Sequence, residues 1–167
     1  MPEEIHGICR VYLNGRLSWQ RTRLEQWHPH CLILAPATLR SMSLDKMRIL
    51  LVEDAPDIRE VFTVLLRVEG ADVTATGSGR EAADLASRRD FDVVLSDLGL
   101  PDMSGDVLIR QILSTARRRT RVIVVTGYGE PYLSRARQAG AEAVFTKPVE
   151  WTRILQSLER PGLAATA

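Results

Sequence analysis

Five short apolar runs from Met47 onward constrain the fold of this chain most strongly, because each is followed by apolar residues at helical spacing. Short runs of apolar and β-branched residues are typical of buried strands. The expected strands span Arg48–Val52, Asp72–Thr76, Asp92–Ser96, Val122–Val125 and Ala141–Phe145. Strands that alternate with helices lie parallel in one sheet, with helices on both of its faces. We therefore predict an α/β, doubly wound (βα)5 domain over residues 47–160.

Residues at the expected helix ends agree with this pattern. Gly70 and Gly140 are placed to end helices, Ser104 to begin one, and Pro131 to lie in the first turn of another. The segment Ser78–Glu81 matches a capping box, in which a serine and a later glutamate each accept a hydrogen bond from the other's backbone amide. The helix boundaries are therefore expected within a few residues of these positions.

The overall charge argues against partners that need a strong field. With 22 Lys and Arg residues against 21 Asp and Glu residues, the formal charge is +1, and we expect no nucleic-acid partner. The run Arg117–Arg119 with Arg121 lies between an expected helix end and a strand start, where cations complement the helix dipole. No apolar stretch is long enough to cross a bilayer and no leader pattern is present, so we expect a cytoplasmic protein with no membrane partner.

All histidines and cysteines lie in the N-terminal part of the chain, at His6, Cys9, His28, His30 and Cys31. Residues 47–160 therefore cannot contribute an imidazole or thiolate to catalysis. The five N-terminal residues follow no familiar zinc-ligand spacing, so we expect reduced thiols and no zinc site.

Residues 1–46 are expected to form an N-terminal extension, and the sequence does not indicate its function. Within it, Cys9–Leu13 and Arg16–Gln20 have the pattern of two strands, and Asn14-Gly15 between them is typical of a type I′ hairpin turn. The composition of Ala35–Ser43 indicates a linker, and residues 161–167 form a short tail. A start of translation at Met42 or Met47 is an alternative account of the segment.

Polar residues with complementary chemistry follow the expected strands, at the edge where ligands bind to such sheets. Glu53 and Asp54 follow the first strand, Asp97 the third, Thr126 the fourth and Lys147 the fifth. Carboxylates about 4–5 Å apart repel by roughly 3–4 kcal/mol per pair, so a cation is expected between them, and all-oxygen ligation suits Mg²⁺. A metal, a carboxylate nucleophile, a hydroxyl and a lysine together indicate formation of an aspartyl-phosphate.

Four short motifs in chain order resemble those of response-regulator receiver domains. They are Leu51-Val-Glu-Asp54, Ser96-Asp-Leu-Gly-Leu-Pro-Asp-Met-Ser-Gly105, Val125-Thr-Gly127 and Thr146-Lys-Pro148. Each follows the strand at which the family carries it, and the resemblance extends over residues 47–160. It implies a flavodoxin-like fold with strand order 2-1-3-4-5, and a phosphoryl group taken from a histidine kinase or a histidine phosphotransfer protein.

The resemblance also implies a role for each residue at the strand ends. Asp97 would be the phosphoacceptor. Thr126 would donate a hydrogen bond to the phosphoryl group, and Lys147 would form an ion pair with it. The Mg²⁺ ligands would be Glu53, Asp54, Asp97 and the backbone carbonyl of Gly99.

Two positions depart from the usual pattern of the family. Three residues before Lys147, where many receivers carry an aromatic residue, this chain has Val144, and the adjacent Phe145 should point to the opposite face of the strand. Two residues after Thr126 stands Tyr128. Our hypothesis is that Tyr128 takes over part of the aromatic role or shields the phosphoryl group from water.

These observations predict a single-domain response regulator, a switch and not an enzyme acting on other substrates. Its downstream protein target would bind the face formed by the fourth helix, fifth strand and fifth helix. One alternative is a phosphohydrolase that uses an aspartyl-phosphate, although such enzymes usually carry their nucleophile after the first strand. Another is a degenerate receiver that acts as a constitutive interaction module.

Overall fold

The computed structural model describes residues 6–13, 16–23 and 44–160 of the chain. The chain divides into two compact units, Met1–Ser41 and Met42–Ala167. In the described part of the chain, no helix has the length and apolar character needed to cross a membrane.

The first unit contains two antiparallel strands, β1 (His6–Leu13) and β2 (Arg16–Arg23). Leu13 lies opposite Arg16, so a two-residue connection joins the strands, as the hairpin prediction requires. The connecting Asn14-Gly15 lies outside the described residues, as do His28, His30 and Cys31 of the candidate zinc ligands.

The second unit alternates five strands with five helices in the order that the sequence predicts. The strands are β3 (Arg48–Val52), β4 (Asp72–Thr76), β5 (Val93–Ser96), β6 (Arg121–Thr126) and β7 (Ala143–Thr146). The helices are α1 (Pro56–Val68), α2 (Gly79–Arg88), α3 (Gly105–Thr115), α4 (Tyr132–Gln138) and α5 (Trp151–Glu159). All strand pairs are parallel and the sheet order is β4-β3-β5-β6-β7, which confirms the predicted order 2-1-3-4-5.

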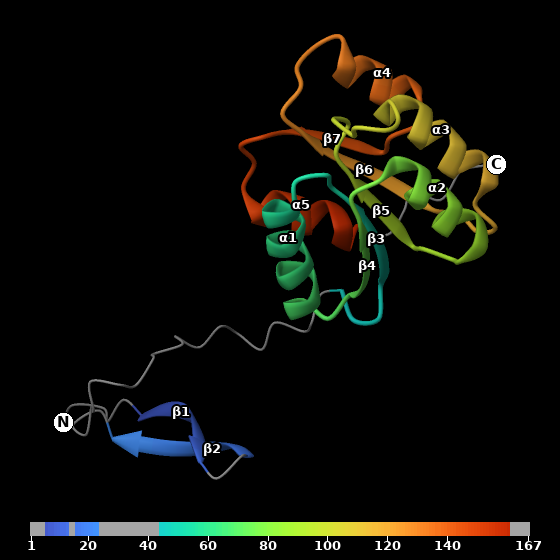
Figure 1. Ribbon diagram of the computed structural model, residues 1–167. Coiled ribbons are helices and arrows are strands. Elements are labelled where there is room, and N and C mark those ends of the chain that lie inside the picture. Colours follow the sequence, from blue (N-terminus) through green and yellow to red (C-terminus); the bar gives the residue numbers. More distant parts are fainter. Residues whose placement is uncertain (1–5, 14–15, 24–43, 161–167) are drawn as a thin grey trace. The chain divides into compact units, whose positions relative to one another are not determined.

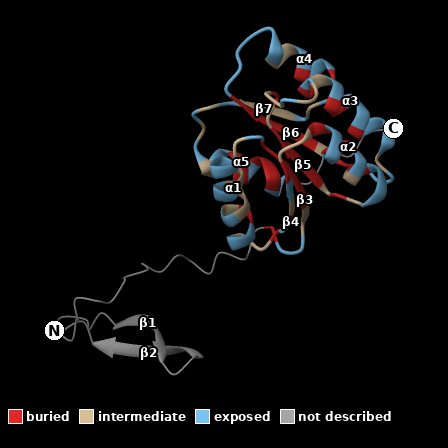
Figure 2. Cartoon of the chain, viewed as in Figure 1, coloured by how far each residue is buried: buried red, intermediate tan, exposed pale blue. Residues whose placement is uncertain are grey.

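Helices cover both faces of the sheet (Figure 1). Side chains of α1 and α5, such as Leu66 and Leu155, pack with Leu51 on one face. Side chains of α2, α3 and α4 pack on the other face, where Ile109 contacts the same cluster as Leu50. The central strands are buried from both sides (Figure 2). Polar residues of these central strands can therefore reach solvent only beyond the strand ends.

The start of α2 is held partly by a residue distant in sequence. The Ser78 hydroxyl accepts a hydrogen bond from the Glu81 amide at 3.1 Å, but the Glu81 carboxylate accepts one from the Thr76 hydroxyl, so only half of the predicted capping box forms. The amides of Gly79 and Arg80 instead donate to Asp102, at 2.9 and 3.0 Å. Hydrogen bonds from these amides and from Ser78 lower the pKa of Asp102 to about 2. Asp102 thereby ties the loop before α3 to α2.

The packed unit begins before Met47, the boundary that the sequence indicated. Leu44 is 1% exposed and lies in the cluster with α1 and α5. Its amide donates to the Glu69 carbonyl at 3.1 Å, and the Lys46 amide donates to Gly70 at 3.1 Å. Lys46 turns the chain into β3 with a left-handed φ of 59°. This short turn carries no periodicity, so no sequence pattern distinguishes it from a linker.

Arg121 stabilises a helix end, though a different one from the helix that precedes it in sequence. Its guanidinium donates to the carbonyls of Ser157 and Leu158 at 2.6 and 2.9 Å, at the C-terminal end of α5. It also pairs with Glu142 at 2.7 Å. A cation is favourable at these unsatisfied carbonyls. Arg121 thus has a structural role at the sheet edge opposite the predicted site.

Candidate functional site

Backbone hydrogen bonds hold the residues that follow the strands against the neighbouring strand. The Glu53 amide donates to the Thr76 carbonyl at 3.1 Å, and the Asp97 amide donates to Val52 at 2.9 Å. The Lys147 amide donates to Thr126 at 2.7 Å. The sheet ladder therefore continues one residue past these strand ends, which places the predicted site residues in fixed register along one edge.

The Lys147 ammonium lies between two carboxylates at this edge. Its Nζ is 2.8 Å from Oε2 of Glu53 and 2.7 Å from Oδ2 of Asp97. The Glu53 and Asp97 side chains are only 4% and 12% exposed, and Lys147 reaches them from a position that is 25% exposed. The sequence argument assigned the cation between the carboxylates to a metal. In the structure, the positive charge between Glu53 and Asp97 is that of Lys147.

The second oxygen of Asp97 accepts hydrogen bonds from the loop that follows. The amides of Leu98 and Gly99 donate to Oδ1 at 2.5 and 3.1 Å. Such an Asx arrangement turns the backbone within two residues. Leu98 then packs against the start of α3, where a Cβ on Gly105 would lie 2.7 Å from the Leu98 Cα. Asp97 is therefore positioned by its own loop as well as by Lys147.

The three charged groups shift one another's protonation. Burial alone would raise the pKa of Asp97, but hydrogen bonds from Lys147, the Thr126 hydroxyl and the Gly99 amide together lower it below its ordinary value. Burial raises the pKa of Glu53, against the effect of Lys147, and the negative charges of Asp97 and Asp54 raise it further. Burial would lower the pKa of Lys147, but both carboxylates together raise it. The arrangement favours an ionised, nucleophilic carboxylate at Asp97.

Asp54 lies beside this group with an exposed side chain. Its loop is held by Arg59 of α1, whose Nη1 donates to the carbonyls of Glu53 at 2.6 Å and Asp54 at 3.0 Å. Gly77 leaves room for this guanidinium, because a Cβ there would lie 2.8 Å from Nη1. The role of Arg59 was not predicted from the sequence, where the signal is only a cation five residues after Asp54.

Thr126 is fully buried at the end of β6, and the chain turns directly after it. The Tyr128 amide donates to the Thr126 hydroxyl oxygen at 3.3 Å. The Tyr128 ring lies over Gly99: a Cβ built on Gly99 would be 3.0 Å from Cε2 of the ring. Its other neighbour is the ring of Tyr132, with centroids 4.9 Å apart. Tyr128 thus stands between the carboxylate site and α4.

The two residues of β7 that the sequence assigned to opposite faces lie there. Val144 packs against the cluster with α2, α3 and α4, and Phe145 against the cluster with α1 and α5. Because Val144 occupies the position on the α4 side, β7 has no aromatic side chain on that face. Tyr128 is the aromatic residue of the described chain nearest to Gly99 in the site loop.

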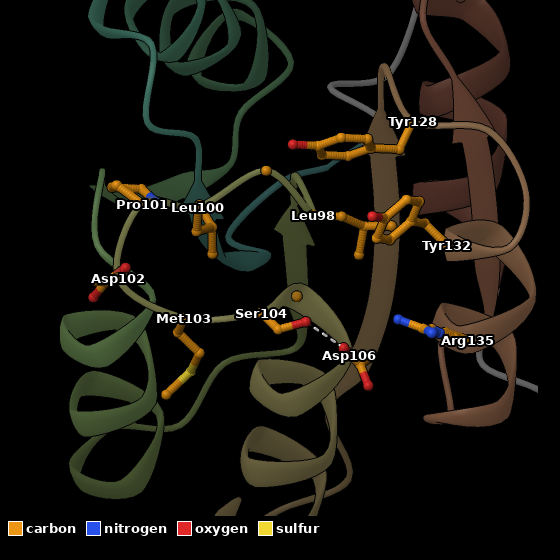
Figure 3. A pocket seen from close by; sticks show the side chains of 12 residues that line it. Leu98, Leu100, Pro101, Asp102, Met103, Ser104, Asp106, Tyr128, Tyr132 and Arg135 are labelled. Atoms are coloured by element: carbon orange, nitrogen blue, oxygen red, sulfur yellow. Dashed lines mark hydrogen bonds between the residues drawn. The ribbon is translucent and has the colours of Figure 1, made fainter.

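A pocket of about 360 Å³ opens next to the carboxylate site, between the loop before α3 and the start of α4 (Figure 3). Leu98, Leu100 and Met103 contribute apolar lining from the loop, and Tyr128 and Tyr132 line the opposite side. Gly99 lines the pocket and also donates to Asp97, so the pocket shares a wall with the carboxylate site.

The donors at the sheet edge fit a Mg²⁺ ion in their chemistry. The carboxylates of Glu53, Asp54 and Asp97 and the carbonyl of Gly99 offer only oxygen, which Mg²⁺ prefers. Within the described residues, no three acidic, histidine or cysteine side chains are arranged to hold a metal by themselves. Mg²⁺ commonly binds one or two carboxylates and completes its shell with water and a phosphate oxygen. The edge is therefore suited to a metal that binds together with a phosphoryl group.

Comparison with curated proteins identifies two-component regulators as relatives. The response regulator protein PilR of Pseudomonas aeruginosa is 35% identical over 112 residues, which are 66% of this chain and 25% of PilR. The cell cycle transcriptional regulator CtrA of Caulobacter vibrioides is 36% identical over 103 residues, which are 61% of this chain and 44% of CtrA. The chain therefore spans less than half the length of either relative.

Two similar solved structures are receiver domains. A CheY-like response regulator receiver domain protein from Methanospirillum hungatei JF-1 has a TM-score of 0.65 and 29% identity, covering 69% of this chain and 92% of that one. The receiver domain of sensor histidine kinase PA1611 from Pseudomonas aeruginosa PAO1 has a TM-score of 0.62 and 32% identity, covering 68% and 98%. That structure holds a magnesium ion coordinated in its active-site cleft.

The sequence model of one protein family matches residues 49–159, a range that contains every predicted site residue. The strand order, the motifs at the strand ends and the relatives agree with this match. Receiver domains are the phosphorylated signalling switches of two-component systems. The chain belongs to the response regulator receiver domain family.

Proposed function

We propose that Asp97 accepts a phosphoryl group from a phosphohistidine of a partner kinase or phosphotransfer protein. The observation that carries this proposal is the ion-pair arrangement at the sheet edge, where the largely buried Asp97 carboxylate lies 2.7 Å from the Lys147 ammonium and has a lowered pKa. An ionised carboxylate is the form that can act as a nucleophile. The absence of histidine from residues 44–160 agrees with a donor on another protein.

The proposed step is a single displacement at phosphorus. An Asp97 carboxylate oxygen attacks the phosphorus atom, the bond from phosphorus to the imidazole nitrogen breaks, and its electron pair stays on that nitrogen, which takes a proton from water. The products are an acyl phosphate on Asp97 and an unmodified histidine. Glu53, Asp54, Asp97 and the Gly99 carbonyl would hold Mg²⁺, which neutralises charge on the phosphoryl oxygens when bound.

Lys147 and Thr126 are proposed to recognise the new phosphoryl group. Lys147 would exchange its contact with the Asp97 carboxylate for one with a phosphoryl oxygen. The Thr126 hydroxyl would donate to another phosphoryl oxygen. Because Thr126 also accepts from the Tyr128 amide, its movement would change the conformation of the chain before α4. This change would alter the binding of a protein target to the surface formed by α4, β7 and α5.

Intact mass spectrometry after treatment with acetyl phosphate tests this proposal. With Mg²⁺ we expect one phosphoryl adduct on the wild-type chain, and no adduct after Asp97→Asn or when EDTA removes the metal. No adduct on the wild type would instead favour a constitutive interaction module. Sustained hydrolysis of added phosphate esters would favour a phosphohydrolase.

Replacement of Tyr128 is expected to shorten the lifetime of the adduct. The ring covers Gly99 beside Asp97, and Tyr128→Ala would open a path for water to the phosphoryl group. We expect the decay rate to rise about threefold to tenfold, which corresponds to roughly 1 kcal/mol in the barrier. Tyr128→Phe keeps the ring and should decay like the wild type. Equal lifetimes for Tyr128→Ala and the wild type would show that the ring does not shield the site.

A further inference from the structure

Exposed large apolar side chains of the second unit gather in two places. One is the outer face of α1, and the other lies along α3 and the start of α4, at Val107, Leu113, Tyr128 and Tyr132. Among residues 44–160, none lies on β7 or α5. Exposed aromatic residues are typical anchors of protein interfaces. The pocket between the loop before α3 and the start of α4 borders the second group.

The carboxylates that line this pocket are engaged inside the protein. Asp102 accepts from the amides at the start of α2, and Asp106 accepts from the Ser104 hydroxyl and pairs with Arg110 at 3.3 Å. The Ser104 contact is visible in Figure 3. Asp102 is therefore an anion stabilised by the start of α2, and the charge of Asp106 is balanced by Arg110 and, at longer range, by Arg135.

Arg135 is the charged lining residue left available to a ligand. Its guanidinium lies 5.7 Å from the centre of the Tyr132 ring, and within residues 44–160 it forms no direct ion pair, although its charge helps to lower the pKa of Asp106. Its nearest helical counterpart, Arg137, is paired with Glu130 at 3.4 Å. The pocket thus combines a cation that has no direct ion pair with two tyrosines that are 46% and 45% exposed.

We propose that this pocket binds a segment of a partner protein in which an acidic residue stands beside an aromatic one. The partner's carboxylate would accept hydrogen bonds from the Arg135 guanidinium, a charge-assisted pairing. Its ring would pack on Tyr128 and Tyr132 over the apolar side chains of the loop. A basic segment would meet Arg135 as a like charge and would be rejected.

The pocket also shares residues with the phosphorylation site, and this second step rests on the proposed function. Tyr128 lines the pocket, and its amide donates to Thr126. Gly99 lines it as well, and its amide donates to Asp97. If Thr126 turns to a phosphoryl group, the Tyr128 wall loses a hydrogen bond and shifts. Affinity for the segment and occupancy of the phosphorylated conformation are then coupled reciprocally.

Four short fluorescent peptides that differ only at a central pair test the binding by fluorescence polarisation with the full chain. We expect saturable binding of the Glu-Phe peptide, and binding about tenfold or more weaker for Gln-Phe, Lys-Phe and Glu-Ala, because each lacks the charged hydrogen bond or the ring. Arg135→Gln and Tyr132→Ala should weaken the Glu-Phe peptide similarly. The matched control is Arg137→Gln, on the same helix, which should bind as the wild type does.

Equal binding of the four peptides, no saturable binding of Glu-Phe, or unchanged binding by Arg135→Gln would overturn the docking proposal. The coupling is read separately, by repeating the titration with acetyl phosphate and Mg²⁺ while intact mass reports the adduct. A full adduct with unchanged peptide affinity refutes the coupling. Failure to form an adduct refutes the proposed function and leaves the docking result to be judged by the first titration.

Discussion

Replacement of Lys147 by methionine is expected to lower the free energy of unfolding by about 3 kcal/mol at neutral pH, because removing one partner leaves buried charge uncompensated. The Glu53 and Asp97 side chains stay buried in this variant, and the ammonium that contacts both is gone. The only other lysine, the exposed Lys46, provides the matched control. Lys46→Met should leave the free energy of unfolding within about 0.5 kcal/mol of the wild type.

The pH dependence of the Lys147→Met deficit follows from the pKa shifts. The raised pKa of Lys147 means that its contribution is complete below the ordinary lysine pKa and is lost only as the pH rises through the raised value. The lowered pKa of Asp97 means that its contribution is present above the ordinary aspartate pKa and is lost as the pH falls through the lowered value. At neutral pH both contributions are present, so the deficit should be large there.

Acid and Mg²⁺ should each reduce the Lys147→Met deficit. Without the ammonium, Glu53 keeps its burial and its acidic neighbours, which already raise its pKa, so it takes up a proton at a higher pH than an ordinary glutamate does. Mg²⁺ supplies a replacement cation, so it should stabilise Lys147→Met more than the wild type. Urea unfolding at two pH values, with and without Mg²⁺, measures both effects. A variant as stable as the wild type at neutral pH would contradict the role of Lys147 between the carboxylates.

The substitution Gly105→Ala is expected to destabilise the domain by about 2 kcal/mol through overpacking. A Cβ at this buried position would lie 2.5 Å from Cδ2 and 2.7 Å from Cα of Leu98. The second contact is with backbone, so a change of rotamer cannot relieve it. Because Leu98 directly follows Asp97, relief must displace the phosphorylation loop, and we expect slower adduct formation as well as a lower melting temperature.

Gly129→Ala is the matched control for the Gly105 variant. A Cβ at Gly129 meets nothing within 4 Å. Its free energy of unfolding should therefore stay within about 0.5 kcal/mol of the wild type. If Gly105→Ala matches Gly129→Ala in both stability and rate of adduct formation, the close packing of α3 on the Asp97 loop has no energetic consequence.

The meeting of the site residues at one edge of the sheet could be predicted, because it depends only on the alternation of strands and helices. Parallel strands that alternate with helices bring their carboxyl ends together, so residues following different strands must share an edge. This logic placed Glu53, Asp97 and Lys147 together although Glu53 and Lys147 are 94 residues apart in sequence. The five strands of the sheet and the opposite orientation of Val144 and Phe145 follow from the same patterns.

Individual contacts could not be predicted, because they depend on side-chain reach between separate elements. The acidic residues at the strand ends led us to predict a metal ion between the carboxylates, whereas in the structure the Lys147 ammonium lies between Glu53 and Asp97. Arg59 acts through backbone carbonyls, which leave no trace in residue type. The Ser78–Glu81 motif fitted a capping box, yet Thr76 and Asp102 compete for its groups from outside the segment.

Chemical localisation of the phosphoryl group tests the central claim most directly. Borohydride reduces an acyl phosphate of aspartate to homoserine, and tandem mass spectrometry of the digested chain then identifies the position. After acetyl phosphate and Mg²⁺ treatment, we predict homoserine at position 97 and at no other acidic residue. Homoserine at position 54, or no reduced residue in a chain that carries an adduct, would contradict the assignment of Asp97 as the phosphoacceptor.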